Sequence, residues 1–292
     1  MATATTAQRR EMIPAQPQGL WGWPAVVNFA LGGLGAGWYV ATVLAAGFER
    51  SPGVTAASWA APVLVLAGFA AVAGEAGRPL RGPRVLTRLR TSWMSRELLA
   101  GIAFVLLVAA DLAFPLRLHR AQAMVAALLL ALAQGFIVRR ARGVTAWDVP
   151  LMPVLFLLSA CLSGSGALLL VESLAGRAPI PAVIGVTLLL IVVSFVAWAR
   201  YLAWTSEDAY RRAVAPLRER RSVVVIDGAG YGLPLLLGLL ALAAPAAAGP
   251  LTALAGALLV AGQAYAKARL IRAAGRLRPI TLAITLSRRR SP

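Results

Sequence analysis

The chain has 292 residues, of which 59% are hydrophobic and 14% charged, and its formal net charge at pH 7 is +18. Soluble domains carry roughly 25% charged residues, so this composition excludes an ordinary soluble protein and indicates a protein of the lipid bilayer. A single cysteine, Cys161, and a single histidine, His119, exclude an iron–sulfur cluster or a bis-histidine haem held by this chain alone. No spacing of His, Asp or Glu suits a metal, so redox work would need a diffusible cofactor and a partner's metal centres.

The first 23 residues contain Arg9 and Arg10 but no short apolar core followed by a small-residue cleavage site. This pattern is not that of a signal peptide. We therefore expect residues 1–23 to remain as a cytoplasmic N-terminal tail.

Eight stretches approach the roughly 20 apolar residues that a transmembrane helix needs. Pro24 and Pro181 stand near the starts of two of them, where a first helical turn tolerates proline. We therefore expect an all-α integral membrane protein with eight transmembrane helices within residues 24–273, arranged as two four-helix bundles. A basic cytoplasmic tail, 274–292, would follow. The expected spans lie near residues 24–47, 56–74, 97–115, 119–138, 150–171, 181–200, 228–247 and 251–271.

The basic residues predict an orientation. With eight spans, 25 of the 29 Lys and Arg residues fall on the side that carries both termini. The other side has only Arg50, Arg117, Arg120 and Arg177. Because basic loops stay in the cytoplasm, both termini are expected there, in a bacterial or archaeal inner membrane. Most of these charges would meet anionic lipid, and no nucleic-acid-binding module accompanies them.

The first span combines glycines with one amide side chain. Gly33 and Gly37 form a G-x-x-x-G pair, and with Gly32 and Gly35 they would let another backbone approach closely in lipid. Asn28 lies about one turn inside this span, where an amide needs a partner in the bundle or a bound ligand. The pattern predicts a small pocket beside a closely packed helix face.

The loop between the second and third spans, residues 75–97, reads "EAGRPLRGPRVLTRLRTSWMSRE" and mixes two glutamates with six arginines. Such a loop is expected to hold a shape and face a partner, in addition to the lipid attraction that basic residues give. The residues expected to bind a partner are Arg81, Arg84, Arg88, Arg90 and Arg96.

Asp111 is the acid that lies well inside an expected span. An intramembrane acid is by default a functional candidate, here for proton transfer. The alternative is a structural ion pair with Arg117 or Arg120. His119 is expected at the membrane interface rather than as a ligand, and Trp147 and the other tryptophans near span ends are expected as interfacial anchors.

Three segments in fixed order carry a family resemblance. "WGWPAVVNFALGGLGAG", then the 75–97 loop with its "GEAGRPL" start, then "TAWDVPLMPVLFLLSACLSGSGALL" resemble the NrfD-type polysulfide reductase membrane subunits and the related DMSO reductase anchor (DmsC-like) subunits. The resemblance runs from Trp21 to Glu172. It is closest to the DMSO-reductase-anchor branch, which includes phenylacetyl-CoA:acceptor oxidoreductase-like members.

The resemblance implies a subunit that exchanges electrons between a membrane quinone, menaquinone or ubiquinone, and a four-cluster ferredoxin-like iron–sulfur subunit. That subunit in turn serves a molybdopterin catalytic subunit. Relatives contact the quinone through polar residues early in the first span and an acid that ends the second. Asn28 stands where they can have histidine, Ala25 where they can have asparagine, and Glu75 matches the acid of their acid-x-Gly-Arg-Pro element.

The residues themselves point to the same place. Asn28 begins the first span, Glu75 ends the second and Glu97 begins the third, so all three lie at similar depth on the terminus-bearing side. A carboxylate in a partly dehydrated pocket can accept a proton from a quinol. We expect Glu75 to be that catalytic acceptor, with Asn28, Arg78 and Glu97 in the quinone site and Glu97 as a further proton-transfer candidate. An ion pair of Glu75 with Arg78 or Arg96 is the structural alternative.

A second function class stays open at this point. Eight spans, glycine-interrupted helices and an intramembrane acid are also compatible with a polytopic small-molecule or ion transporter. Transporters often have matched repeats with polar residues near the midplane. The sequence has no such repeat, and its polar residues gather on one side, which favours the anchor. The terminal substrate, quinone type and electron direction do not follow from the sequence.

Overall fold

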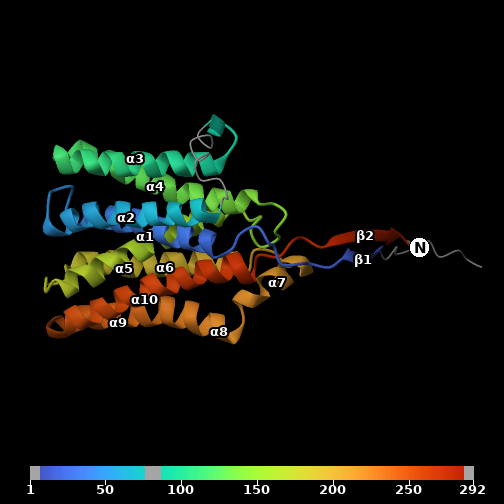
Figure 1. Cartoon of the computed structure of the whole chain (residues 1–292). Coiled ribbons are helices and arrows are strands. Elements are labelled where there is room, and N and C mark those ends of the chain that lie inside the picture. The colour runs from blue at the N-terminus through green and yellow to red at the C-terminus, as the bar shows by residue number, and fades with distance from the viewer. Residues whose placement is uncertain (1–6, 76–86, 286–292) are drawn as a thin grey trace, which may run out of the picture.

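The computed structural model describes residues 7–75 and 87–285, and over these ranges the chain is mostly helical. Long helices run side by side along one direction, and a two-stranded ribbon extends from one end of them (Figure 1). The long helices are α1 (Trp23–Ala45), α2 (Pro52–Glu75), α3 (Trp93–Ala113), α4 (Arg117–Arg140), α5 (Met152–Leu174), α6 (Pro181–Leu202), α9 (Leu233–Ala243) and α10 (Ala248–Ala268). Shorter segments are α7 (Asp208–Val214), η2 (Ala215–Leu217), α8 (Arg220–Ser222), the π-helical η3 (Val223–Gly232), η4 (Pro245–Ala247) and the π-helical η5 (Arg269–Ala273).

Within the described ranges, seven helices are long and apolar enough to cross a membrane. They include the continuous helical segments Arg220–Ala243 and Pro245–Ala273, which take in the π-helical stretches. Helix α3 has 21 residues, three of them charged, and is not among the seven. The expected count of eight spans is therefore not confirmed, although a helix lies over each of the eight apolar stretches.

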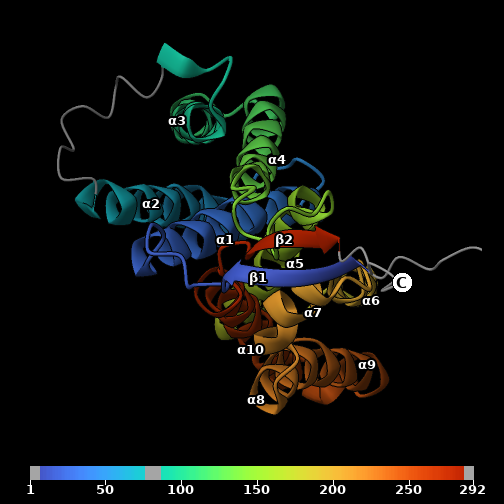
Figure 2. The same cartoon turned by 90° about the vertical axis from the view of Figure 1, so that its right-hand side faces the viewer.

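Helix α1 lies at the centre of the molecule (Figure 2). It packs against α2, α4, α5 and α10, whereas α3 packs chiefly against α4. Helix α5 continues the contact to α6 and α10, and α9 packs on α10. Because α1 touches helices from both the early and the late parts of the chain, the expected division into two four-helix bundles is not confirmed.

The glycines of α1 allow close contact between backbones. A Cβ atom on Gly37 would lie 1.8 Å from the carbonyl oxygen of Ala160 in α5, and one on Gly164 would lie 1.9 Å from the carbonyl carbon of Gly37. On another face of α1, a Cβ on Gly35 would lie 2.6 Å from the carbonyl oxygen of Ala61 in α2. These distances leave no room for side chains, so glycine is what lets α1 meet both neighbours.

The terminal segments pair with each other, which the sequence analysis did not anticipate. Strand β1 (Ala7–Ile13) and strand β2 (Ile280–Thr285) form an antiparallel ribbon that projects from one end of the helices (Figures 1 and 2). Single bridges between Pro17 and Arg276, and between Val144 and Leu277, continue this pairing toward the bundle. The two ends of the described chain therefore leave the bundle on the same side.

A core of aromatic residues closes this end of the bundle. Trp147 is 2% exposed, donates from Nε1 to the Leu270 carbonyl at 3.0 Å and stacks on Trp21 with ring centroids 4.9 Å apart. Tyr201 donates from its hydroxyl to the Ala146 carbonyl at 3.0 Å. The prediction that Trp147 is an interfacial anchor is wrong, because its indole is buried in contact with Trp21, ahead of α1, and with Leu270 of η5.

Candidate functional site

Three polar side chains from three helices meet inside the bundle. The Asn28 amide of α1 donates to Glu97 Oε1 of α3 at 2.9 Å, and Gln134 Nε2 of α4 donates to the same oxygen at 3.2 Å. Gln134 Nε2 also lies 3.3 Å from the Asn28 carbonyl oxygen. Their residues are 4%, 6% and 1% exposed, respectively. We call Asn28, Glu97 and Gln134 the polar cluster.

The local sequence explains how these side chains come together. Ser92 caps α3 by accepting from the Ser95 backbone N–H at 3.3 Å, which fixes the start of α3 one turn before Glu97. A Cβ on Gly32 would lie 2.5 Å from Gln134 Nε2, so this glycine of α1 makes room for the glutamine. A Cβ on Gly68 of α2 would lie 3.0 Å from Asn28 Oδ1. Glycines thus admit polar side chains here, in addition to backbones.

One polar atom of the polar cluster has no hydrogen-bond partner within the described ranges. Asn28 Oδ1 is buried and has no partner among the residues that the structure describes. A buried polar atom without a partner costs on the order of 1–3 kcal/mol, so such an atom is expected to receive a donor. The cluster therefore has capacity for one further polar group.

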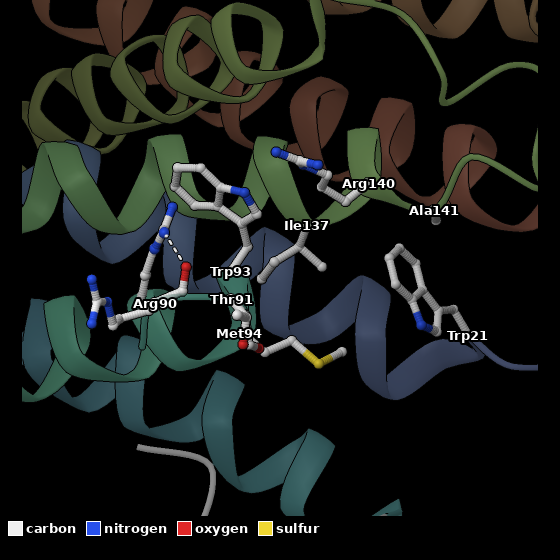
Figure 3. Close-up of a pocket in the computed structure, with 10 residues that line it drawn as sticks. Trp21, Arg90, Thr91, Trp93, Met94, Ile137, Arg140 and Ala141 are labelled. Atoms are coloured by element: carbon white, nitrogen blue, oxygen red, sulfur yellow. Dashed lines mark hydrogen bonds between the residues drawn. The ribbon is translucent and has the colours of Figure 1, made fainter. Parts of the chain in front are cut away.

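A cavity of about 600 Å³ opens at the terminus-bearing end of the same three helices. Figure 3 shows Trp21, Trp93 and Arg140 around it. The polar cluster lies deeper along these helices, because Glu97 follows Trp93 by one turn and Asn28 follows Trp21 by two. The lining residues are Trp21, Arg90, Thr91, Ser92, Trp93, Met94, Arg96, Ile137, Arg140 and Ala141.

Arg96 holds the wall of the cavity in place. Its guanidinium donates from Nε to the Leu89 carbonyl and from Nη2 to the Arg90 carbonyl, both at 2.9 Å; the second bond is the dashed line in Figure 3. Arg96 Cζ also lies 4.2 Å above the Trp93 ring, which stacks on Phe136 at 4.0 Å between centroids. The segment before α3 is thereby tied to the mouth of the cavity.

Lys267 of α10 approaches the polar cluster from the late part of the chain. A Cβ on Gly33 would lie 2.9 Å from Lys267 Nζ and 3.6 Å from Gln134 Oε1, so the amine and the amide oxygen lie against the same point of α1. Lys267 Nζ also lies 6.0 Å from the centroid of the Phe156 ring. Lys267 is 4% exposed. The last helix therefore reaches the same site.

The model of the DMSO reductase anchor subunit (DmsC) family matches residues 17–207. The chain belongs to this family. The matched range contains the whole polar cluster and every residue that lines the cavity, whereas Lys267 lies beyond it. Membership makes the chain an integral membrane protein of the kind that anchors a molybdoenzyme complex. No curated protein matches the chain.

Of the quinone-site residues expected in this anchor protein, the structure brings Asn28 and Glu97 together. Helix α2 ends at Glu75, but the Glu75 side chain and the whole of Arg78 lie outside the described residues. The expected roles of Glu75 and Arg78 remain predictions. Sequence reasoning missed Gln134, although an amide inside the apolar stretch 119–138 is a signal that could have found it.

Of the arginines expected to bind a partner, some lie within the described residues and some lie outside them. Arg81 and Arg84 lie outside the described residues, Arg88 and Arg90 are exposed, and Arg96 turns back to its own segment. Arg90 also lines the mouth of the cavity. The exposed basic surface near the cavity is therefore made, within the described ranges, by the segment just before α3 together with Arg140 at the end of α4.

Asp111 lies at the far end of α3 in a buried ion pair. Arg120 Nε is 3.0 Å from its Oδ2, and both side chains are 4% exposed. Of the two ion-pair partners considered, Arg120 is the observed one, because Arg117 pairs with Glu49 instead. Whether Asp111 transfers protons remains a prediction. Among the described residues no group of three or more His, Cys, Asp and Glu side chains could hold a metal ion.

Proposed function

We propose that this family member is the quinone-interacting anchor of a molybdopterin and iron–sulfur oxidoreductase complex. It would exchange electrons between membrane quinone or quinol and a four-cluster ferredoxin-like subunit, which serves the molybdopterin subunit. The observation that carries the proposal is the polar cluster beneath the cavity. A cavity of about 600 Å³ is within the usual range of small-molecule sites, roughly 300–1,000 Å³.

The residues present fit a quinone head group. Trp21 and Trp93 line the cavity with aromatic rings, and Arg140 offers donors at the mouth. Deeper in, Asn28 Oδ1 is an acceptor without a partner and Glu97 is a buried carboxylate that holds two amide donors. Asn28 would orient the ring through its amide, and Glu97 would accept a proton from the ring hydroxyl as the electrons leave.

We further propose that α3 also crosses the membrane, giving eight spans. Helix α3 runs beside α4 for most of its length and is joined to it by a short turn (Figure 1). An even number of crossings keeps both chain ends on one side, in agreement with the pairing of β1 and β2. That side would be the cytoplasm, since it carries 25 of the 29 basic residues.

The iron–sulfur subunit would dock on the cytoplasmic end around the cavity. Arg88 and Arg90 are exposed there, and Arg96 fixes the segment that carries them. Electron transfer requires the acceptor to lie close to the ring, so docking over the cavity mouth is the arrangement that the site favours. Arg81 and Arg84 belong to the same loop and are proposed to contribute.

The test is Glu97→Gln in the assembled complex, with Glu172→Gln as its matched control. Glutamine keeps the size and hydrogen-bonding capacity of the side chain but cannot take up a proton. Glu172 is also a helix carboxylate, but it pairs with Arg177 at the opposite end of α5. We expect quinol-linked turnover to fall about 10²- to 10⁴-fold in Glu97→Gln, the usual range for a general base, and to persist in Glu172→Gln.

Turnover fed by artificial dyes that reduce the iron–sulfur subunit directly should survive in both variants, which separates loss of chemistry from loss of assembly. A Glu97→Gln complex with quinol-linked turnover within threefold of wild type would remove Glu97 from the proton-accepting role. A wild-type complex that binds no quinone and passes no electrons from quinol would contradict the proposed function itself.

A further inference from the structure

Lys267 is the only lysine of the chain, and the other 28 basic residues are arginines. This matters chemically, because an arginine guanidinium stays protonated in proteins whereas a lysine amine can lose its proton when it is buried. This single lysine is placed inside the bundle and is 4% exposed. The lysine thus differs from the positively charged side chains of the loops, which are all arginines.

The described surroundings of Lys267 contain no anionic group that would pair with an ammonium group. Within the described parts of the chain, Nζ makes no hydrogen bond and no ion pair, and Gln134 Oε1 is the polar atom that lies near the same point of Gly33. From α1 and α5 it meets Gly33 and Phe156, neither of which titrates. A buried charge without a partner is expensive, and the site, as far as the structure describes it, offers no group that would hold Lys267 in the ammonium form.

The neighbouring basic residues on the last helix have other partners. Arg269 donates to Glu219 and to the Ser222 hydroxyl, and Arg272 lies with its Cζ 4.5 Å over the Trp23 ring. Arg269 is half-buried against these partners, and Arg272 is exposed. Lys267 is therefore the residue of this stretch that is directed inward.

Gln134 lies between the region of Lys267 and the Glu97 carboxylate. Its Nε2 donates to Glu97 Oε1 at 3.2 Å, while its Oε1 lies on the side where Lys267 Nζ meets Gly33. Amine, amide and carboxylate thus follow one another from α10 through α4 to α3. Each glycine of the Gly32–Gly33 pair leaves room for one of the two inward side chains, Gln134 and Lys267.

We propose that Lys267 is the second proton-accepting group of the site and takes the proton on from Glu97. The inference rests on the proposed function, in which a quinol gives two electrons to the iron–sulfur subunit and must release two protons. The Glu97 carboxylate accepts the first proton and passes it, by way of a water molecule, to the neutral Lys267 amine, which becomes an ammonium. Glu97 then accepts the second, and both groups later return their protons to water; quinone reduction runs the same steps in reverse.

The other buried acid of this helix cannot take that second proton. Asp111 lies fourteen residues beyond Glu97, which is about 21 Å along a helix, and it is held by Arg120. Lys267 is the titratable side chain that the structure places next to the polar cluster. It acts through Glu97, without contact to the ring, and is therefore a positioning and proton-relay residue.

A single lysine makes the first test direct. Protein made with ¹⁵Nζ-lysine and embedded in lipid nanodiscs gives one amine signal, whose position reports ammonium or neutral amine across a pH titration. Loss of the Glu97 negative charge in Glu97→Gln should move the midpoint of this titration to lower pH by about one unit, since a nearby carboxylate favours the ammonium form. A signal that stays ammonium from pH 5 to 10 and ignores Glu97→Gln would overturn the proposal without reference to quinone.

The second test uses turnover of the assembled complex. Lys267→Met and Lys267→Arg should both lower quinol-linked kcat by about 10- to 100-fold and leave the quinol KM and dye-linked activity unchanged. Arginine keeps the charge but cannot release the proton, so a merely electrostatic or packing role predicts that Lys267→Arg retains activity. Gln263→Met, one turn earlier on α10, is the control for loss of a buried polar side chain.

Lys267→Ala supplies a check against misfolding, because small primary amines such as ethylamine should restore turnover by entering the space left by the side chain. The inference would be refuted if the quinol-linked turnover of Lys267→Met were within threefold of the wild-type turnover. Absence of quinol-linked turnover in the wild type would instead refute the proposed function. The ¹⁵Nζ-lysine titration would then be the test that still shows whether Lys267 exchanges a proton and senses Glu97.

Discussion

The buried charges of this membrane protein fall into two kinds at the scale of single residues. Asp111 and Arg120 satisfy each other, and Arg120 also donates to the Phe48 carbonyl, so this pair has its hydrogen bonds made within the protein. Glu97 instead accepts from two neutral amides, and Lys267 has no anionic partner among the described residues. The Asp111–Arg120 pair suits a structural link between helices. Glu97 and Lys267, which have no oppositely charged partner in the part of the chain that the structure describes, suit the proton exchange proposed above.

The structural role of Asp111 gives a stability prediction. Asp111→Asn leaves the Arg120 charge buried without its partner, which typically costs about 3–5 kcal/mol. The control is Glu49→Gln, which breaks the exposed pair with Arg117, and exposed pairs contribute about 0–1 kcal/mol. Thermal unfolding of the purified protein in detergent, followed by circular dichroism, measures both. Equal stability of the two variants would show that the buried pair does not hold α3 to α4.

At the scale of elements, hydrophobic length predicted where helices lie but not how they meet. Apolar stretches, prolines and basic ends are local signals, and a helix lies over each of the eight stretches. The approach of Lys267 to Gly33 and the pairing of β1 with β2 join residues more than 200 positions apart, so no local pattern contains them. Asn28 and Glu97 were found because polar residues are rare in lipid, and Gln134 was missed although it obeys the same rule.

The close packing of α1 on α5 makes a prediction for Gly37. Its Cβ would lie 1.8 Å from the Ala160 carbonyl oxygen, which is backbone and cannot move aside, so Gly37→Ala should cost about 3 kcal/mol. Gly185 of α6 is the matched control, since a Cβ there meets nothing within 4 Å and alanine favours a helix by about 0.5–1 kcal/mol. Thermal unfolding in detergent should show a loss for the first and a small gain for the second. A neutral Gly37→Ala would mean that α1 and α5 separate easily.

At the scale of the whole molecule, the site and both chain ends belong to the same end of the bundle. The cavity is lined by the start of α1, the segment before α3 and the end of α4, all at the end from which the β1–β2 ribbon projects (Figure 1). A soluble partner that docks over the cavity must therefore lie on the side of the termini. Orientation in the membrane decides in which compartment the rest of the complex works.

Cysteine labelling tests this orientation through the two loops that α6 joins. In a Cys161→Ala background, Ala178→Cys before α6 and Ser206→Cys after it are exposed reporters at opposite ends of one helix. Because basic residues crowd the end that carries Ser206, we expect a membrane-impermeant maleimide added to intact cells to label Ala178→Cys, and to label Ser206→Cys only after the cells are opened. The reverse pattern would place the termini, the cavity mouth and the soluble partners outside the cytoplasm. Labelling of both reporters in intact cells would instead show that α6 does not cross the membrane, which would contradict the eight-span arrangement.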